Sequence, residues 1–190
     1  MFGREGYTRA SIDTIAAEAS VSTRTIYNHF GDKEHLFREV IQESATQVAE
    51  AQIELIRCHL DAIIDMERGL TAFGLVWATS TSEFAEHFAL VRQIHAEVDH
   101  IPAATLQAWQ EIGPLRVHRE LVRRMQHLAD RGLLTIDDAG QVANHLVSLI
   151  SAEIVNRTYY GARPLPPTEV AGIVTAGIRT FLHGYAPPSP

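Results

Sequence analysis

Several hydrogen-bonding side chains lie together in a stretch of the chain that contains no carboxylate. No Asp or Glu occurs from Ala19 to Gly31, and the hydrogen-bonding residues there include Thr23, Arg24, Thr25, Tyr27 and Asn28. Hydroxyl, guanidinium and amide groups can donate to phosphates and to the edges of bases, and no nearby negative charge would repel a phosphate. The stretch is therefore a candidate for contact with a nucleic acid.

The other reactive side chains do not form a recognisable catalytic or metal centre. Of His95, Glu97, Asp99 and His100, only His95 and Asp99 have the four-residue spacing of two ligands on one helix face, and no third ligand is defined. We interpret this group as the solvated end of a helix. No nucleophile–base pair, phosphate-binding glycine loop or paired-acid motif occurs, so we expect no enzyme, no metal and no cofactor.

The polar stretch is predicted to form the second helix of a helix-turn-helix. Ser11 can cap a first helix, whose apolar positions at helical spacing are Ile12, Ile15, Ala16 and Ala19. Val21 is suited to fill the angle of the turn, and Ser22 can cap a second helix that ends at Phe30. Ile26 and Phe30 give this second helix an apolar inner side, which leaves its polar side chains outside.

The rest of the chain has a helical pattern almost throughout. Asp32 can cap a long helix from Lys33 to about residue 58, which would measure roughly 39 Å at 1.5 Å per residue. Asp137 and Thr168 are candidate caps for two later helices. Further helices are predicted at residues 62–80, 83–99, 102–111, 114–131, 138–160 and 168–184. Strand patterns are almost absent, so we predict an all-α fold with a small N-terminal unit and a larger helical body.

Composition and charge set the class of protein. The chain has 190 residues, 46% of them hydrophobic, and no apolar run approaches the roughly 18 residues that span a bilayer. No secretory signal is visible, and Cys58 is a lone cysteine, so we expect a cytoplasmic protein without membrane contact. A net charge of −7 argues against nucleic acid, but the acid-free stretch allows a small docking surface. We interpret the basic run from Arg116 to Arg124 as a surface face paired with Glu120.

The helix-turn-helix segment resembles a known signature. The residues Gly6-Tyr7, Ala10-Ser11-Ile12 and Ile15-Ala16, followed by Val21-Ser22, Thr25-Ile26-Tyr27, His29-Phe30, Lys33-Glu34 and Leu36, are similar to the DNA-binding motif of TetR-family transcriptional regulators. The segment from Gly113-Pro114 to Leu134, with Asp137-Asp138, resembles the AefR-like subgroup. The resemblance implies an all-α homodimer with a helix-turn-helix DNA-binding head at residues 1–41 and a helical ligand-binding and dimerisation domain at 42–185. Residues 186–190 are expected to form a disordered tail.

The resemblance also implies roles for individual residues. Base edges and nearby phosphates would be contacted by Thr23, Arg24, Thr25 and Asn28. Tyr27 and His29 would bind the DNA backbone, Ser11 could donate to a phosphate, and Lys33 would meet a phosphate at the start of the long helix. Operator DNA, a second copy of the chain and an unknown small-molecule effector are the partners implied.

Two features depart from the family pattern. Ser20 occupies a turn position where the family has Gly, so a positive φ there would carry some strain. Only Met1 to Glu5 precede Gly6-Tyr7, so most of the usual first helix is expected to be missing, although Phe2 should still pack into the head. We expect that native residues precede Met1.

The helical body is expected to hold a ligand and a dimer interface. Large apolar residues in the middle helices include Phe73, Trp77, Phe84, Phe88 and Trp109, of which Phe73 and Trp77 are the candidate ligand contacts. The late helices have apolar stripes that the resemblance places at the dimer interface through Leu146, Leu149, Ile150, Ile173, Val174, Ile178 and Phe181, although an intrachain core explains them as well. Gly172 and Gly177 would allow close approach to the partner.

These features support two hypotheses of function. In the first, the chain is a ligand-responsive repressor that binds a near-palindromic operator as a homodimer and is released by a small molecule. In the second, it is a helical ligand-binding or protein-interaction module without sequence-specific DNA binding. A steep dependence of DNA affinity on salt, with preference for one palindrome, would separate the two.

Overall fold

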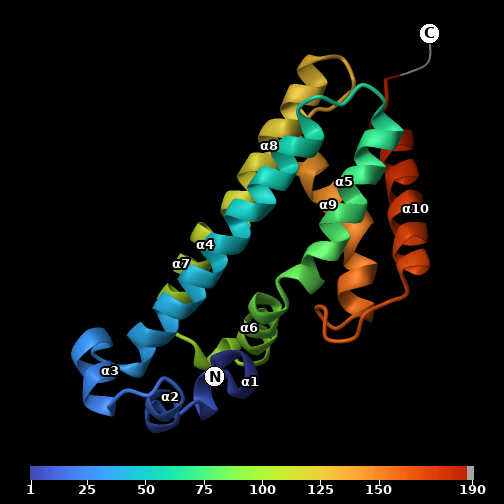
Figure 1. Ribbon diagram of the computed structural model, residues 1–190. Coiled ribbons are helices and arrows are strands. Elements are labelled where there is room, and N and C mark those ends of the chain that lie inside the picture. Colours follow the sequence, from blue (N-terminus) through green and yellow to red (C-terminus); the bar gives the residue numbers. More distant parts are fainter. Residues whose placement is uncertain (188–190) are drawn as a thin grey trace.

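A computed structural model describes residues 1–187, and within this range the chain is helical with no strand (Figure 1). The helices are α1 (Phe2–Arg9), α2 (Ile12–Glu18), α3 (Thr23–Phe30), α4 (Lys33–Leu60), α5 (Met66–Glu83), α6 (Ala85–Ala96), the 3-10 turn η1 (Val98–His100), α7 (Ala103–Ile112), α8 (Pro114–Asp130), α9 (Ala139–Arg157) and α10 (Pro167–Tyr185). The predicted all-α class is confirmed. None of the described helices combines the length and the apolarity needed to cross a bilayer.

Side-chain caps explain where four of the described helices begin, namely α3, α4, α5 and α9. The Ser22 side chain accepts a hydrogen bond from the Thr25 amide, and the Asp32 side chain accepts one from the His35 amide, as the sequence predicts. Three caps differ from the prediction. Ser11 occupies the N-cap position of α2, but its side chain makes no capping hydrogen bond. Asp138 rather than Asp137 caps α9, and α10 begins at Pro167 without a Thr168 cap, because a proline in the first turn has no N–H to satisfy.

The helices form a head at one end and a body behind it (Figure 1). Helices α1 to α3 make up the head, and α4, with 28 residues and a length of about 42 Å, runs from the head to the far end of the body. Helix α8 packs along α4, whereas α9 and α10 pack on each other and on α5. Helix α6 contacts α1 of the head on one side and α4 and α5 on the other.

Two hydrophobic cores stabilise this arrangement. One fills the body with residues of α4, α5, α8, α9 and α10. The other begins in the head with Phe2 and Ile26, includes Phe37 at the start of α4, and continues to Ile94 of α6 and Trp109 of α7. Because the head shares this second core with α6 and α7, it does not close a core of its own within residues 1–41.

The first helix is short but well packed. It spans Phe2–Arg9 and is interrupted at Gly6, whose φ of 81° and ψ of 178° are not helical. The Phe2 ring is buried and meets the Phe37 ring edge-on at 5.0 Å, which confirms the expected packing of Phe2. The predicted tail at 186–190 falls partly outside the described residues, which end at Pro187; Ala186 is extended.

Candidate DNA-binding surface and ligand cavity

The turn between α2 and α3 holds the two helices in a fixed geometry. Ser20 has a φ of 56°, the positive value expected where the family pattern has Gly. The Val21 amide donates to the Ala16 carbonyl at 3.0 Å, and Ala16 itself is buried. Val21 does not fill the angle as expected: it is 42% exposed and lies outside the core, whereas Ala16 of α2 and Ile26 of α3 are buried in the same core.

The outer side of α3 is polar and open to solvent. Ile26 is buried and Phe30 is partly buried, so the opposite side of the helix faces outward. The exposed residues on that side are Arg24, Thr25, Tyr27, Asn28 and His29, whereas Thr23 is partly buried. Thr25 contributes to the local fold as well, because its hydroxyl lies 2.8 Å from the hydroxyl of the capping Ser22. The arrangement presents donors and acceptors on one rigid helix, as readout in a DNA groove requires.

Ser11 and Lys33, the predicted phosphate contacts before and after α3 in the chain, differ in whether they have a partner inside the protein. Ser11 is exposed at the N-cap of α2, and its side chain makes no capping hydrogen bond there, so its hydroxyl can donate to a phosphate. Lys33 has an internal partner instead: its ammonium donates to the Thr8 carbonyl at 3.0 Å and lies 5.0 Å from the centre of the Tyr7 ring. A carbonyl near the end of α1 and an aromatic face together form a cation site. Lys33 therefore ties α1 to α4 in this structure.

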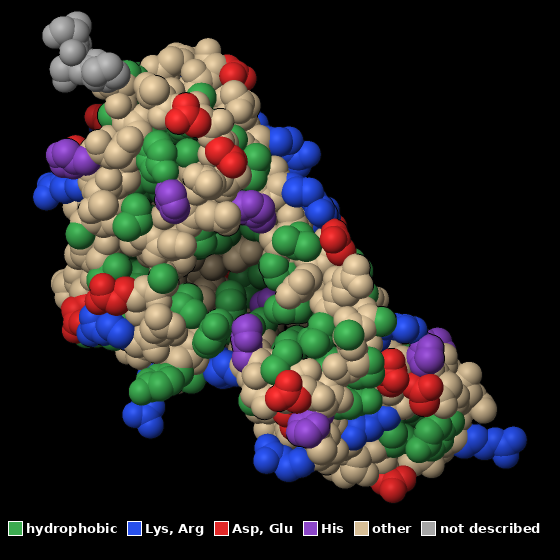
Figure 2. Space-filling model, turned by 180° about the vertical axis from the view of Figure 1, so that it is seen from behind, with side chains coloured by type: hydrophobic (Ala, Val, Ile, Leu, Met, Phe, Trp, Pro, Cys, Tyr) green, Lys and Arg blue, Asp and Glu red, His purple; other side chains and the backbone are tan. Residues whose placement is uncertain are grey.

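A cavity of about 340 Å³ lies in the body, with walls from α4 to α9. Some wall residues, such as Ala45 and Val91, belong to the core shared with the head, and others, such as Ala49 and Leu121, belong to the body core. The cavity therefore lies between the two cores. Figure 2 shows a hollow on the rear face that is bordered by hydrophobic and histidine side chains, the types that line this cavity.

Of the two predicted ligand contacts, the structure places one in the cavity wall. Trp77 lines the cavity, whereas Phe73 is fully buried behind it, with the two ring centroids 5.6 Å apart, and is absent from the wall. Sequence reasoning missed the polar wall residues Gln52, His118 and Asn144. Gln52 lies one turn from Val48 in an otherwise apolar stripe, and such a polar interruption is a signal that could have identified it.

His87 is a further wall residue, and it is linked to α4. Its Nδ1 atom lies 3.0 Å from the Ser44 hydroxyl. Burial lowers the pKa of His87 from 6.5 to about 4, so the imidazole is neutral at pH 7. His95 also lines the cavity, and its ring packs against the Tyr160 ring at 5.0 Å.

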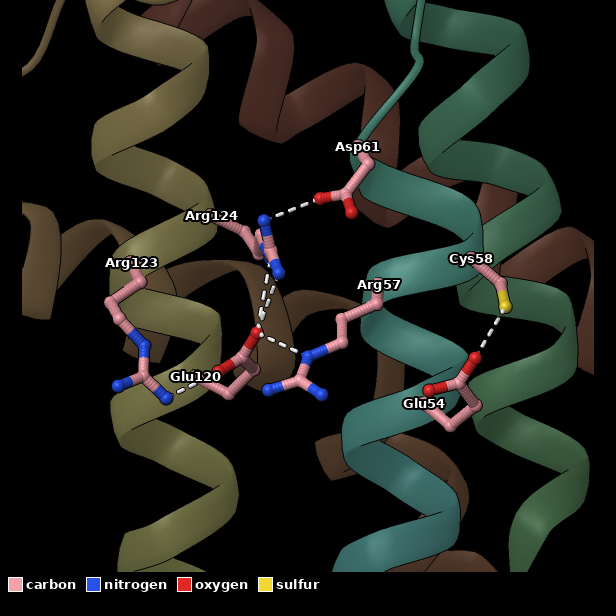
Figure 3. A network of polar contacts seen from close by, with 7 residues as sticks. All are labelled: Glu54, Arg57, Cys58, Asp61, Glu120, Arg123 and Arg124. Atoms are coloured by element: carbon pink, nitrogen blue, oxygen red, sulfur yellow. Dashed lines mark hydrogen bonds and ion pairs between the residues drawn. The ribbon is translucent and has the colours of Figure 1, made fainter.

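The basic run on α8 is neutralised by acids (Figure 3). Glu120 is 1% exposed and forms ion pairs with Arg57, Arg123 and Arg124, and Arg124 also pairs with Asp61. Burial alone would raise the pKa of Glu120, but the three guanidinium hydrogen bonds outweigh burial and lower the pKa to about 2. This face fits the paired surface expected from the sequence.

The predicted dimer residues require correction. Five of them are fully buried inside the single chain, because α9 and α10 pack on each other and on α5; these are Leu146, Ile150, Val174, Ile178 and Phe181. Only Leu149 and Ile173 are partly exposed. Gly177 also serves the intrachain contact, since a Cβ atom there would lie 2.3 Å from the Leu149 carbonyl oxygen, whereas Gly172 faces open space.

Comparisons with known proteins agree with this architecture. The family described as bacterial regulatory proteins of the tetR family matches residues 1–40, and the family described as the C-terminal domain of AefR-like transcriptional repressors matches residues 68–187. A curated relative, the HTH-type transcriptional repressor AcnR of Corynebacterium efficiens, is 25% identical over 182 residues, which cover 94% of this chain and 86% of AcnR.

Two solved structures are similar over nearly the whole chain. A TetR-family transcriptional regulator from Mesorhizobium loti, described as putative, has a TM-score of 0.85 and 30% identity, covering 98% of this chain and 91% of that one. The Flavonoid-responsive Regulator FrrA has a TM-score of 0.71 and 25% identity, covering 99% and 92% of the two chains.

Proposed function

The chain belongs to the TetR family of transcriptional regulators, and we propose that it is a repressor that binds a near-palindromic operator as a homodimer and is released by a small molecule. The observation that carries the proposal is the outer side of α3, where exposed donors and acceptors lie on a helix anchored by the buried Ile26. The alternative of a helical module without DNA binding is not favoured, because the DNA-binding family matches residues 1–40.

The proposed division of the chain follows the family. Residues 1–41 form the DNA-binding head and residues 42–185 the ligand-binding and dimerisation domain. The proposed DNA contacts are Ser11, Thr23, Arg24, Thr25, Tyr27, Asn28 and His29, and Lys33 supports them from behind by holding α1 to α4. A regulator of chromosomal DNA acts in the bacterial cytoplasm and needs no catalytic group. We propose that this chain is cytoplasmic and is not an enzyme.

The proposed dimer interface uses the outward sides of α9 and α10. Small or partly exposed residues recur there at helical spacing: Ser148, Leu149 and Ala152 on α9, and Gly172, Ile173, Ala176 and Thr180 on α10. Small side chains permit close approach of two helix pairs, and pairing by a twofold axis gives a four-helix interface. The twofold axis also places two α3 helices for successive major grooves, about 34–36 Å apart.

Release is proposed to start in the cavity. Helix α6 lines it through His87 and Val91 and packs against α1 on another side. In the proposed mechanism the dimer has two conformations that differ in the spacing of the heads, and only one of them fits the operator. An effector that binds more tightly to the other conformation lowers DNA affinity, and the ratio of its affinities for the two conformations limits the size of the effect. The name of FrrA describes a response to flavonoids in that protein, which supports a small organic effector here.

Genomic footprinting of the full chain in its native bacterium tests the proposal. We expect protection of a small set of near-palindromic sites, with half-sites one helical turn apart and an affinity that falls steeply as salt is raised. Uniform, sequence-independent protection, or none, would contradict the proposal.

A further inference from the structure

The walls of the cavity between the two cores carry no charged side chain. The residues that line it include no Lys, Arg, Asp or Glu, although the chain has 39 residues of those four types in 190. The polar wall residues are Gln52, His87, His95, His118 and Asn144. A bound carboxylate or phosphate would lose water without meeting a lysine or arginine, and a bound ammonium would meet no carboxylate, and such burial is strongly unfavourable.

The polar wall groups are side-chain amides and imidazoles, and several make no hydrogen bond within the described part of the chain. His87 is paired with the Ser44 hydroxyl. Within residues 1–187, no side-chain hydrogen bond engages Gln52, His118 or Asn144. Amides and imidazoles can both donate and accept, so they match hydroxyl and carbonyl groups on a ligand.

Aromatic rings make up much of the apolar wall. Trp77 reaches the cavity from α5, Trp109 from α7 and Phe88 from α6. Trp77 is supported from behind by the buried Phe73, and Trp109 is only 8% exposed, so both indoles have limited freedom to move. Rigid aromatic walls favour flat aromatic ligands through stacked and edge-on contacts.

The volume sets the size of the occupant. A dry cavity of about 150 Å³ holds one benzene molecule. The cavity here has about 340 Å³ and so has space for roughly two rings with small substituents.

We infer that the effector is an uncharged molecule with about two aromatic rings and hydroxyl or carbonyl substituents, and that carboxylates and phosphorylated ligands are excluded. The inference rests on the proposed function only in treating this cavity as the effector site. The rings lie against Trp77 and Trp109, and the substituents bond to Gln52, His118 and Asn144.

Isothermal titration calorimetry of the full-length protein at pH 7 tests the inference with three probes. These are 2-naphthol, which is neutral and bicyclic, 2-naphthoate, which has the same rings and a carboxylate, and 1-octanol, which is neutral and aliphatic. We expect 2-naphthol to bind at least tenfold more tightly than either of the others. Equal or tighter binding of 2-naphthoate or 1-octanol, or no binding of 2-naphthol, overturns the inference.

The two tryptophans of the chain both line the cavity, so tryptophan fluorescence reports on this site alone. We expect 1-octanol, at concentrations that saturate 2-naphthol binding in calorimetry, to leave the tryptophan emission nearly unchanged. A Trp77→Phe, Trp109→Phe double variant tests the location of the site by calorimetry. If it binds 2-naphthol with the same affinity and heat as the original chain, the ligand binds elsewhere and the site is rejected.

A charge-introducing variant tests the reason for the selectivity. Gln52→Lys puts an ammonium in the wall, and we expect it to bind 2-naphthoate at least tenfold more tightly than the original chain does. Gln126→Lys, on an exposed position of α8 outside the cavity, is the matched control and should leave both affinities unchanged. No gain in 2-naphthoate affinity for Gln52→Lys, with its helical circular dichroism intact, counts against the wall assignment.

The outcomes separate this inference from the proposed function. The probe affinities are measured on protein without DNA, whereas operator binding is measured by footprinting without a probe. Loss of the selectivity between probes rejects the effector class even if a palindromic operator is found. Absence of operator binding rejects the repressor function and leaves the measured ligand preference standing.

Discussion

The Glu97 carboxylate accepts a hydrogen bond from the Thr8 backbone amide at 2.9 Å, although the two residues lie 89 positions apart. Glu97 directly follows α6 and Thr8 belongs to α1, so this bond ties the head to the helix that lines the cavity. Gly6 makes the approach possible. A Cβ atom at that position would lie 2.6 Å from the Glu97 Oε1 atom, and the φ of 81° already favours glycine.

The first prediction concerns this contact. Gly6→Ala should lower the free energy of unfolding by about 1–3 kcal/mol, because a φ of 81° strains any residue with a Cβ atom. It should also weaken operator binding, because the added methyl displaces the Glu97 carboxylate from the Thr8 amide. Gly132→Ala is the matched control: its φ is also positive, at 71°, but nothing lies within 4 Å of the added Cβ. Urea unfolding and DNA titration of both variants measure the difference. Equal operator affinities for the two would show that the head does not depend on this contact.

The second prediction concerns the outer side of α3. Arg24→Ala should weaken binding to the footprinted operator by about tenfold or more, because an arginine contact to a base edge contributes on the order of 1–3 kcal/mol of discrimination. Arg163→Ala removes an exposed arginine from the loop between α9 and α10, outside helices α1 to α3, and serves as the control. Fluorescence anisotropy with a labelled operator measures both. An unchanged affinity for Arg24→Ala would remove this residue from the proposed DNA surface.

The third prediction concerns the buried carboxylate of Glu120. Its folded-state pKa of about 2 lies below the ordinary 4.5, so the ionised group stabilises the fold above pH 4.5. That contribution is lost as the pH falls from 4.5 towards 2. Glu120→Gln should therefore lower the free energy of unfolding at pH 7 by about 3 kcal/mol. Glu111→Gln, which breaks the exposed pair with Arg119, should cost less than about 1 kcal/mol in the same urea titration.

The fourth prediction concerns His87 and a separate range of pH. Because burial lowers its pKa to about 4, the unfolded chain binds a proton below pH 6.5 that the folded chain does not bind. The free energy of unfolding should therefore fall as the pH drops from 6.5 to 4, by up to about 1.4 kcal/mol per pH unit from this group. His87→Gln should flatten the slope in that range, and His127→Gln, at an exposed position, should keep it. Parallel slopes for the two variants would mean that His87 is not the group responsible.

The fifth prediction separates the inner and outer sides of α10. Gly177→Ala should destabilise the chain by about 1–3 kcal/mol, because the added methyl would meet the Leu149 carbonyl oxygen. Gly172→Ala has open space around it in the single chain and improves helix propensity, so it should leave the fold intact. If α9 and α10 pair with a second copy as proposed, the methyl group of Gly172→Ala should weaken dimerisation while the fold of each chain stays intact. Analytical ultracentrifugation measures the dimer dissociation constant. An unchanged dimer constant would move the interface elsewhere.

Much of the local structure could be predicted from the sequence. The caps at Ser22 and Asp32 depend on contacts within a few residues, which spacing along the chain reveals. The polar outer side of α3 follows from the positions of Ile26 and Phe30 for the same reason. The positive φ of Ser20 follows from the family resemblance, in which this turn position has Gly.

The partners of each side chain could not be predicted in this way. Lys33 was expected to meet a phosphate, but the Thr8 carbonyl and the Tyr7 ring are within its reach in the folded chain. Phe73 and Trp77 looked alike as candidate ligand contacts, and only packing put one in the core and the other in the cavity wall.

The amino-acid order by itself determined where the helices lie and which side of each is apolar, because a periodicity of 3.6 residues is a local property. Tertiary structure alone decided what each apolar side is buried against. Ile150 and Val174 pack inside their own chain, Ala49 and Val91 border a cavity, and Phe2 lies beneath Phe37. Burial of apolar surface has no preferred direction or partner, so only the assembled helices determine whether such a residue meets a neighbour, a ligand or a second copy.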